Sequence, residues 1–390
     1  MRETVGRDVV IVEAARTPIG RGKPESGYYT DVHPNELLGA CYGAVVERAG
    51  IAPELVENVI GGCVTQVGEQ SQNIARNAWL QAGLPVSTPA STIDMQCGSA
   101  QQAVNLAAAQ IAAGVHDVAI GGGVEHMGHV PMGANAAHPE ETGVPFPPAL
   151  LERYALIPQG LSAELIAERW EIPRSELDQF GVRSQQLAAR ATEEGRFERE
   201  IVPMSVNGST YVTDQGIRPD TNLETLAQLK PAFKPDGRIT AATSSQISDG
   251  AASVLLMSAE KADELGVKAR ARIVDQVTAG VDPVIMLTGP IPATRMILER
   301  NDLQIGDIDL IEINEAFASV VLAWSNELQP DMDRVNVNGG ALALGHPLGS
   351  SGARLITTLL HELERSDKEL GLVTMCTAGG TGPATLIQRI

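Results

Sequence analysis

The fold is decided by two stretches of the sequence, Val45-Val46-Glu47-Arg48-Ala49-Gly50-Ile51 and Ile297-Leu298-Glu299-Arg300-Asn301-Asp302-Leu303. They lie 252 residues apart (297 − 45 = 252), and each combines aliphatic residues with a Glu-Arg step. Each is expected to close a helix and to precede a short apolar strand, at 56–60 and at 308–313. The sequence therefore predicts an α/β protein built from two duplicated halves.

The same order of elements continues along the chain after both stretches. A turn rich in glycine and serine opens a predicted helix after residue 98 and again after residue 349. A predicted strand follows each helix, at 118–120 and at 371–375, and the first of these runs straight into three glycines at 121–123. Alternating strands and helices predict mostly parallel sheets, and equivalent loops of the two halves should meet at a pseudo-twofold axis.

The middle of the chain has no counterpart in this repeat. It contains proline-rich loops and two amphipathic helical patterns, at 163–170 and 175–194. Loops of this kind often carry binding function, so we expect an inserted loop domain there. The predicted division is a first half at 1–126, completed by about 248–272, the loop domain at 127–247, and a second half at 273–390.

The composition excludes several classes of function. The 390 residues carry 29 basic and 48 acidic side chains, and the net charge of −19 disfavours nucleic acid and anionic membranes as partners. No apolar run is long enough to span a membrane, and no apolar signal segment is visible near the N-terminus. Four cysteines, at spacings that match neither a zinc site nor a redox motif, predict reduced thiols, a cytoplasmic location and no metal site.

Cys97 is the first candidate for chemistry. It lies directly before the predicted helix that opens at Ser99. Free N–H groups and the dipole at a helix N-terminus favour a thiolate, so we expect a lowered pKa and a nucleophilic thiol. The alternative is a small buried hydrophobic residue, which is also our interpretation of Cys41 and Cys63.

Three further residues lie at loops where the two halves should meet. His346 lies in a glycine-rich loop that the repeat places opposite Cys97, and it is a candidate base or else an ordinary loop histidine. Cys376 follows a buried strand and enters a flexible turn whose N–H groups could line an oxyanion site. Asn314 follows another strand, where α/β proteins place their sites, although Asn314 and Glu315 could also cap a helix.

Taken together, seven segments resemble the thiolase family in their sequence and in their spacing, and they span nearly the whole chain. They are Gln96-Cys97-Gly98-Ser99-Ala100, Asn314-Glu315-Ala316-Phe317, Gly345-His346-Pro347-Leu348-Gly349, the turn after Cys376, and residues 13–20, 61–64 and 244–252. The resemblance implies a five-layer αβαβα fold with an inserted loop domain, assembled as a homotetramer that is a dimer of dimers.

The resemblance also implies the chemistry. Cys97 would attack the 3-keto carbon of a 3-ketoacyl-CoA while His346 takes its proton, and Cys376 would protonate the acetyl-CoA enolate that leaves. One oxyanion hole would come from His346 and a water held by Asn314, the other from the backbone N–H groups of Cys97 and Ala378. Many members have glycine where this chain has Ala378, so its N–H can serve only if its φ is negative.

Coenzyme A enters as a substrate, and no permanently bound cofactor is implied. By family position, its contacts would come from Arg218, Thr225, Phe233 and Ser245, with Phe317 and Ala378 beside the reactive end. Because the whole chain is acidic, phosphate binding would depend on local basic residues. Lys230, Lys234 and Arg238 could supply local positive charge or could be ordinary surface residues.

The direction of the reaction and the substrate stay open at this point. Residues 61–66 and 96–103 look closest to actinobacterial thiolases of steroid side-chain and fatty-acid degradation, which favours cleavage of an acyl group longer than acetoacetyl. The alternatives are a biosynthetic thiolase that condenses two acetyl-CoA and a non-catalytic acyl-CoA-binding protein. A related condensing enzyme that depends on acyl-carrier protein is disfavoured, because it would carry a histidine at Cys376.

Overall fold

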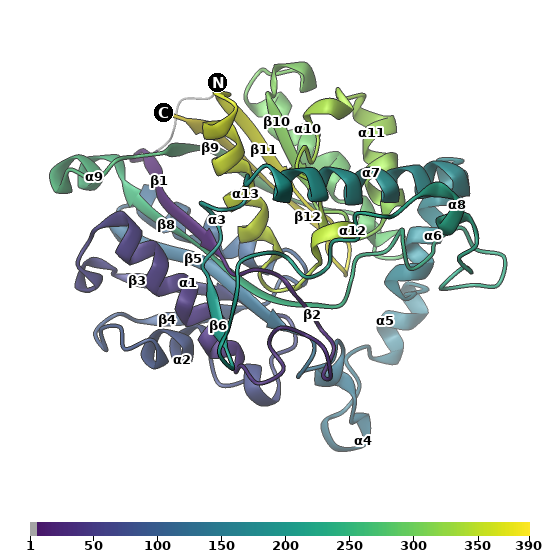
Figure 1. The fold of residues 1–390 in the computed structure, drawn as a ribbon, viewed down its shortest axis with the longest axis horizontal. Coiled ribbons are helices and arrows are strands. Elements are labelled where there is room, and N and C mark those ends of the chain that lie inside the picture. Colours follow the sequence, from purple (N-terminus) through teal and green to yellow (C-terminus); the bar gives the residue numbers. More distant parts are fainter. Residues whose placement is uncertain (1–5) are drawn as a thin grey trace.

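The computed structural model describes residues 6–390, and its main feature is one mixed sheet of ten strands (Figure 1). Nine strands lie in the order β4-β3-β5-β8-β1 for the first half, continued by β9-β12-β11-β10 for the second, and β2 pairs with β8 at its side. The halves join where β1 and β9 pair antiparallel through two residue pairs. The strands are β1 (Val9–Arg16), β2 (Gly20–Arg21), β3 (Asn58–Gly62), β4 (Ala90–Ile93), β5 (Val118–His126), β8 (Ser248–Ser258), β9 (Ala271–Gly280), β10 (Leu310–Ile313), β11 (Leu370–Thr374) and β12 (Thr381–Arg389).

The topology confirms the predicted duplication, but the prediction of mostly parallel sheets is wrong, because six of the nine strand pairs in this sheet are antiparallel. In the first half β4, β3 and β5 are parallel, while β8 and β1 follow antiparallel. The second half repeats this with β10 and β11 parallel and β12 and β9 antiparallel, and Val335 pairs with β10 in place of β4. The 252-residue offset also relates the first residues of β3 and β10 (310 − 58), of α3 and α13 (351 − 99), and of β5 and β11 (370 − 118).

The two halves of this sheet, joined at β1 and β9, form two of the five predicted layers, and the helices form the other three. The middle layer is the pair α3 and α13, whose apolar side chains share one buried cluster with strands of both halves. The outer layers cover the opposite faces of the two halves, and α6 and α7 of the inserted segment pack on the outer helices of the second half. The helices are α1 (Pro34–Ala49), α2 (Ile74–Gln81), α3 (Ser99–Ala112), α9 (Ala259–Leu265), α10 (Pro290–Arg300), α11 (Ala318–Leu328), α12 (Ala341–Leu344) and α13 (Ser351–Arg365).

The inserted segment lies against both halves (Figure 1): α6 and α7 contact α11 and α12 of the second half, whereas Met204 and Val206 belong to the buried cluster of the first half. Its two long helices lie where the amphipathic patterns predicted them, and a short hairpin and a five-residue helix follow. Its elements are α4 (Pro139–Thr142), α5 (Pro148–Arg153), α6 (Gln159–Arg169), α7 (Arg174–Glu193), β6 (Met204–Val206), β7 (Ser209–Tyr211) and α8 (Leu223–Ala227). The division of the chain at 126, 247 and 272 stays a prediction.

Two glycine positions explain how closely the layers approach. The strand predicted at 118–120 is longer than expected, because β5 continues through its glycines to His126. A Cβ at Gly121 would lie 2.5 Å from the Cα of Val104, so only glycine lets α3 pack on this strand. At Gly352 a Cβ would lie 2.4 Å from the backbone N of Gln101, so the first turns of α3 and α13 touch through backbone. This contact brings the loops before the two helices together.

Among residues 6–390, no helix combines the length and the apolar character that a membrane crossing would need.

Candidate active site

The turn that carries Cys97 is held in a conformation that few residues adopt. Gln96 has a φ of 51°, and the turn is fixed by Ser99, whose Oγ accepts from the N–H of Met95 at 2.9 Å and donates to the carbonyl of Gln96 at 2.6 Å. α3 then begins at Ser99. The sulfur of Cys97 is thereby directed into the space between the halves, where it is 2% exposed.

The prediction of a lowered pKa for the Cys97 thiol is wrong for the protein without substrate. Burial raises the pKa of the Cys97 thiol to about 12, although hydrogen bonds from the backbone N–H groups of Ala378 and of Cys97 itself favour the charged form. The carboxylates of Glu125 and Asp94 raise this pKa further. Desolvation outweighs the helix N-terminus here, because almost no water reaches the sulfur. Cys97 is therefore a neutral thiol at pH 7.

His346 is also neutral. Its ring is 3% exposed, and burial together with the positive charge of Arg354 lowers the pKa of His346 to about 3. Its Nδ1 lies 2.6 Å from Ser351 Oγ, and its Nε2 lies 3.2 Å from Nδ2 of Asn314. Its backbone N–H donates to Ser248 Oγ at 3.1 Å, which fixes the loop.

Asn314 lies in a loop between β10 and α11. Its backbone N–H donates to Thr374 O at 3.1 Å, and its side-chain Oδ1 is one of the buried atoms without a hydrogen-bond partner among the described residues. The helix-cap interpretation of Asn314 and Glu315 is wrong, because α11 starts only at Ala318 after Phe317. Asn314 can therefore offer its amide to a water or a ligand.

Cys376 follows β11 by two residues and is fully buried. Burial and the neighbouring Cys97 both raise the pKa of the Cys376 thiol, so the two sulfur atoms interact and Cys376 can deliver a proton as a neutral acid. The hairpin turn that follows leaves Ala378 with a negative φ and places Gly379 and Gly380 at a φ of 80°. Alanine is therefore tolerated at 378, and its N–H is available to Cys97.

Sequence reasoning missed the side chains that hold the catalytic loops. Glu125, at the end of β5, is buried and accepts from the backbone N–H groups of Val64, Thr65 and Gly349, at 2.9, 3.0 and 2.9 Å. It thereby connects a first-half loop to the loop that carries His346. Its position at the carboxyl end of a strand could have drawn attention to it.

Glu315 does the same in the second half. Its carboxylate is buried and accepts from Ser184 Oγ at 2.6 Å, from Asn336 Nδ2 at 2.9 Å and from the N–H of Leu342 at 3.2 Å. It connects the Asn314 loop to the inserted helix α7 and to α12.

The residues expected to contact coenzyme A fall into two neighbouring groups. Arg218 and Thr225 line a pocket of about 300 Å³, together with Leu226, Ala242 and Gln246. Phe233 and Phe317 meet edge to face with ring centres 5.8 Å apart. The N–H of Ser245 donates to Ala316 O at 3.0 Å, which places Ser245 beside the second group.

Two of the three basic residues considered for phosphate are engaged elsewhere. Lys234 pairs with Glu168, and Arg238 donates to the carbonyls of Ala167 and Ile172 at 2.9 and 2.8 Å. Arg238 therefore closes the end of α6. Lys230 is exposed.

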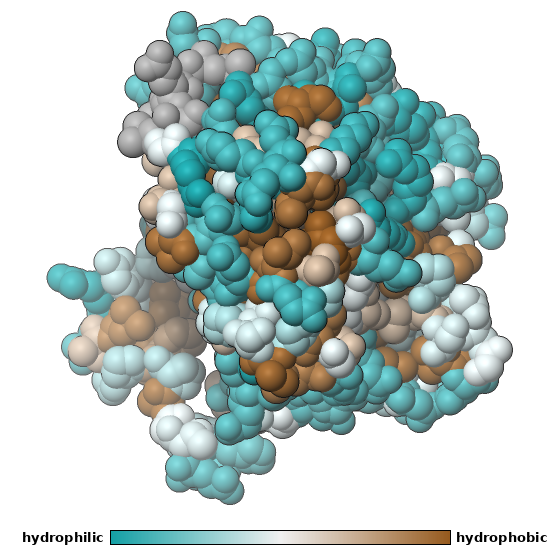
Figure 2. Space-filling view, turned by 90° about the vertical axis from the view of Figure 1, so that its left-hand side faces the viewer, coloured by the Kyte–Doolittle hydropathy of each residue, from teal (hydrophilic) through white to brown (hydrophobic). Residues whose placement is uncertain are grey.

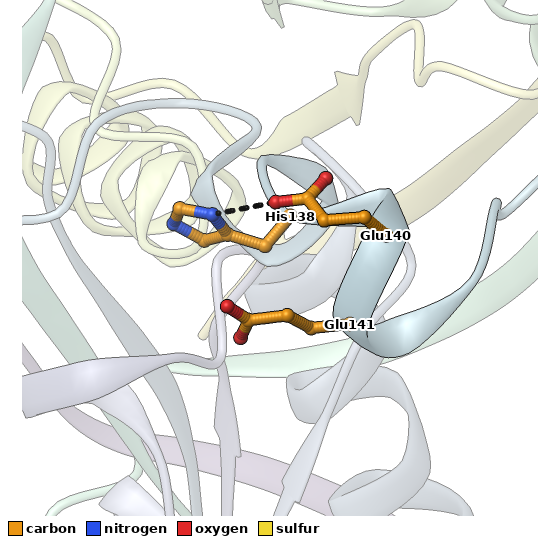
Figure 3. Close-up of side chains that lie close together, drawn as sticks. All are labelled: His138, Glu140 and Glu141. Atoms are coloured by element: carbon orange, nitrogen blue, oxygen red, sulfur yellow. Dashed lines mark ion pairs between the residues drawn. The ribbon is translucent and has the colours of Figure 1, made fainter.

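Outside this site, one group of side chains in the described part of the chain has the spacing of metal ligands. His138, Glu140 and Glu141 lie on and beside α4, where His138 Nδ1 is 3.5 Å from Glu140 Oε1 (Figure 3). All three are exposed, and none belongs to the expected site residues. Exposed acidic groups of this kind are common without an ion, so the group supports no metal assignment.

Comparison with known proteins agrees with this geometry. The family patterns described as "Thiolase, N-terminal domain" and "Thiolase, C-terminal domain" match residues 9–260 and 267–389. A steroid 3-ketoacyl-CoA thiolase of Mycobacterium tuberculosis, FadA6, is 43% identical over 395 residues, which cover 100% of this chain and 96% of that protein. A 3-ketoacyl-CoA thiolase of Saccharophagus degradans is 46% identical over 396 residues, covering 98% and 99%.

A solved structure agrees in the same way. The crystal structure of the Bacillus anthracis acetyl-CoA acetyltransferase matches with a TM-score of 0.91 at 40% identity, over 100% of both chains. The duplicated five-layer fold, the family patterns and these relatives lead to one conclusion: the chain belongs to the thiolase family of acyltransferases.

Proposed function

We propose that this enzyme cleaves 3-ketoacyl-CoA with coenzyme A, giving acetyl-CoA and a shortened acyl-CoA. The observation that supports the proposal is the set of two interacting buried thiols and a buried neutral imidazole, which come from loops of both halves of the duplicated chain. Cleavage of a carbon–carbon bond needs a nucleophile for the acyl fragment and an acid for the carbanion, and this set contains both.

In the first half-reaction, the sulfur of Cys97 bonds to the keto carbon while its proton passes to His346 Nε2. Because thiol and imidazole are both neutral at rest, proton transfer accompanies attack and no preformed ion pair is involved. The keto oxygen becomes an oxyanion that the N–H groups of Cys97 and Ala378 stabilise. Each such donor typically contributes about 2.7–4 kcal/mol to the transition state.

Collapse of this intermediate breaks the bond between C2 and C3. The acyl group stays on Cys97 as a thioester, and the electron pair leaves on the acetyl-CoA enolate, whose oxygen faces His346 and a water held by Asn314. Cys376 donates its proton to the enolate carbon, and the proton on His346 then restores the Cys376 thiol. In the second half-reaction the thiol of coenzyme A attacks the Cys97 thioester, and Cys97 leaves as a thiol.

Coenzyme A is proposed as a substrate that binds between the inserted segment and the second half. Arg218 would meet its nucleotide end, with Thr225 and Phe233 beside it, while Ser245 would contact the pantetheine arm. Phe317 and Ala378 would lie beside the reacting thioester. No permanently bound cofactor takes part in these steps.

The degradative direction is proposed over acetoacetyl-CoA synthesis because the two relatives described above are named 3-ketoacyl-CoA thiolases, one of them for steroids.

We further propose a cytoplasmic, homo-oligomeric enzyme. β4 ends the sheet as an unpaired edge strand, which is a ready surface for pairing with a second copy. Figure 2 shows hydrophobic side chains gathered on the face that includes this side of the molecule, and Leu80 and Val86 beside β4 are 40% and 79% exposed. A monomeric mass by light scattering would contradict the assembly.

The proposed chemistry is tested by trapping its intermediate. After incubation with acetyl-CoA, digestion and mass measurement should find an added acetyl group on the peptide that contains Cys97, and the Cys97→Ser variant should lack the thioester. Turnover with coenzyme A should then be compared for acetoacetyl-, medium-chain and steroid side-chain 3-ketoacyl-CoA. Absence of the adduct would refute the mechanism, and turnover restricted to acetoacetyl-CoA would refute the degradative assignment.

A further inference from the structure

The base His346 has two ring nitrogens, and the chemistry proposed above works only if the proton is on the right one. Nε2 faces Asn314, which the proposed mechanism places beside the substrate, whereas Nδ1 faces the first turn of α13. A neutral imidazole with its proton on Nε2 could not accept the proton of Cys97 at that atom. The protein must therefore hold His346 with the proton on Nδ1.

Ser351 is the side chain in contact with Nδ1. Its Oγ lies 2.6 Å from His346 Nδ1 and 2.8 Å from the carbonyl oxygen of Pro347. A hydroxyl has one proton to donate, and a carbonyl oxygen can only accept. The Ser351 proton is therefore directed to Pro347 O, and the oxygen of Ser351 is left to accept a hydrogen bond from Nδ1–H.

The other end of the ring agrees with this assignment. Nε2 lies 3.2 Å from the amide nitrogen of Asn314, which is a donor, so Nε2 is the acceptor. The positive charge of Arg354 on the same helix disfavours a second proton on the ring. Ser351 is 1% exposed, so water does not compete for this hydrogen bond.

We propose that Ser351 is a positioning residue for the base: it accepts the Nδ1–H hydrogen bond, fixes the tautomer of His346 and so keeps Nε2 without a proton, as an acceptor. After the thiol proton arrives, the same Nε2–H becomes a donor to the enolate oxygen, so one hydrogen bond serves both steps. The inference rests on the proposed function of His346 and assigns a new role to Ser351.

The proton position can be observed directly. Neutron diffraction from crystals of the deuterated wild-type protein should show deuterium on Nδ1 of His346 and none on Nε2. Deuterium on Nε2 would overturn the proposal, whatever the variants do.

Kinetics provide the second test, and the preceding residue, Ser350, provides a matched control. Ser350 also donates to Pro347 O, at 3.2 Å, but it has no contact with His346 among the described hydrogen bonds. For cleavage of acetoacetyl-CoA, Ser351→Ala should lower kcat about tenfold at unchanged KM, which is the usual effect of one buried hydrogen bond. Ser350→Ala should stay within twofold of wild type, and Ser351→Thr should recover much of the loss.

Several outcomes contradict the role of Ser351. A kcat of Ser351→Ala within twofold of wild type would do so, as would equal losses in Ser350→Ala and Ser351→Ala, since these would indicate a general effect on the loop. If Ser351→Ala does not fold, the wild-type neutron map decides alone. A His346→Gln variant that still acylates Cys97 at the normal rate would refute the base while leaving the tautomer measurement valid.

Discussion

The neutral resting state of Cys97 gives a sharp prediction about its reactivity. With a pKa of about 12, the thiolate is roughly one part in 10⁵ at pH 7 and grows about tenfold for each pH unit. The rate of alkylation by a neutral reagent should therefore rise about 1,000-fold from pH 6 to pH 9, with no plateau. An unperturbed thiol, with a pKa near 8.5, would rise about 200-fold and level off above pH 9.

The assay is iodoacetamide labelling in the absence of substrate, followed over time by the mass of the peptide that contains Cys97. Far-UV circular dichroism at each pH confirms that the protein stays folded. His346→Gln provides the control: because His346 is neutral throughout this range, its removal should leave the slope unchanged. A constant rate between pH 6 and pH 9 would show a thiolate–imidazolium pair and would refute the argument from burial.

Three further predictions concern single residues. In Cys376→Ala, Cys97 should still accept an acetyl group from acetyl-CoA. Cleavage of acetoacetyl-CoA should be about 10²–10⁴-fold slower, because the enolate has lost its proton donor. A cleavage rate near that of wild type would contradict this role of Cys376. Gly352→Ala should lower the free energy of unfolding by about 1–3 kcal/mol in urea titrations, because its Cβ meets backbone, whereas Gly306→Ala, with open space around it, should not. Burial lowers the pKa of His361 to about 3, so the unfolded chain takes up a proton at a higher pH than the folded protein, and the free energy of unfolding falls as the pH drops below about 6.5. Between pH 7 and pH 5, the free energy of unfolding of His361→Gln should therefore fall by about 2 kcal/mol less than that of wild type. Equal decreases in the two proteins would contradict this effect of His361.

The duplication of the fold is the feature that the sequence predicted best. The 252-residue offset predicted from two helix ends also relates strands and helices that share little sequence, because duplicated halves keep their layer order. The length of the strand after residue 118 could not be predicted, because glycine is typical of turns as well as of close backbone approach. In β5 the glycines admit α3, which only the packed structure reveals.

For the candidate site, the sequence predicted the residues but not their charge states. Cys97, His346, Cys376 and Asn314 were identified from loops at strand and helix ends, and the fold brings them to one buried region. Their charge states could not be predicted in the same way. A helix N-terminus alone favours a thiolate, but the degree of burial, which depends on residues hundreds of positions away, reverses that preference.

The burial of Cys97 also bears on how the enzyme withstands oxidants. Peroxides react with thiolates, and the first product, a sulfenic acid, forms in proportion to the thiolate fraction and to solvent access. A sulfur that is 2% exposed and protonated at neutral pH is a poor target on both counts. The burial that keeps Cys97 protonated should therefore also protect the proposed nucleophile from peroxide while no substrate is bound.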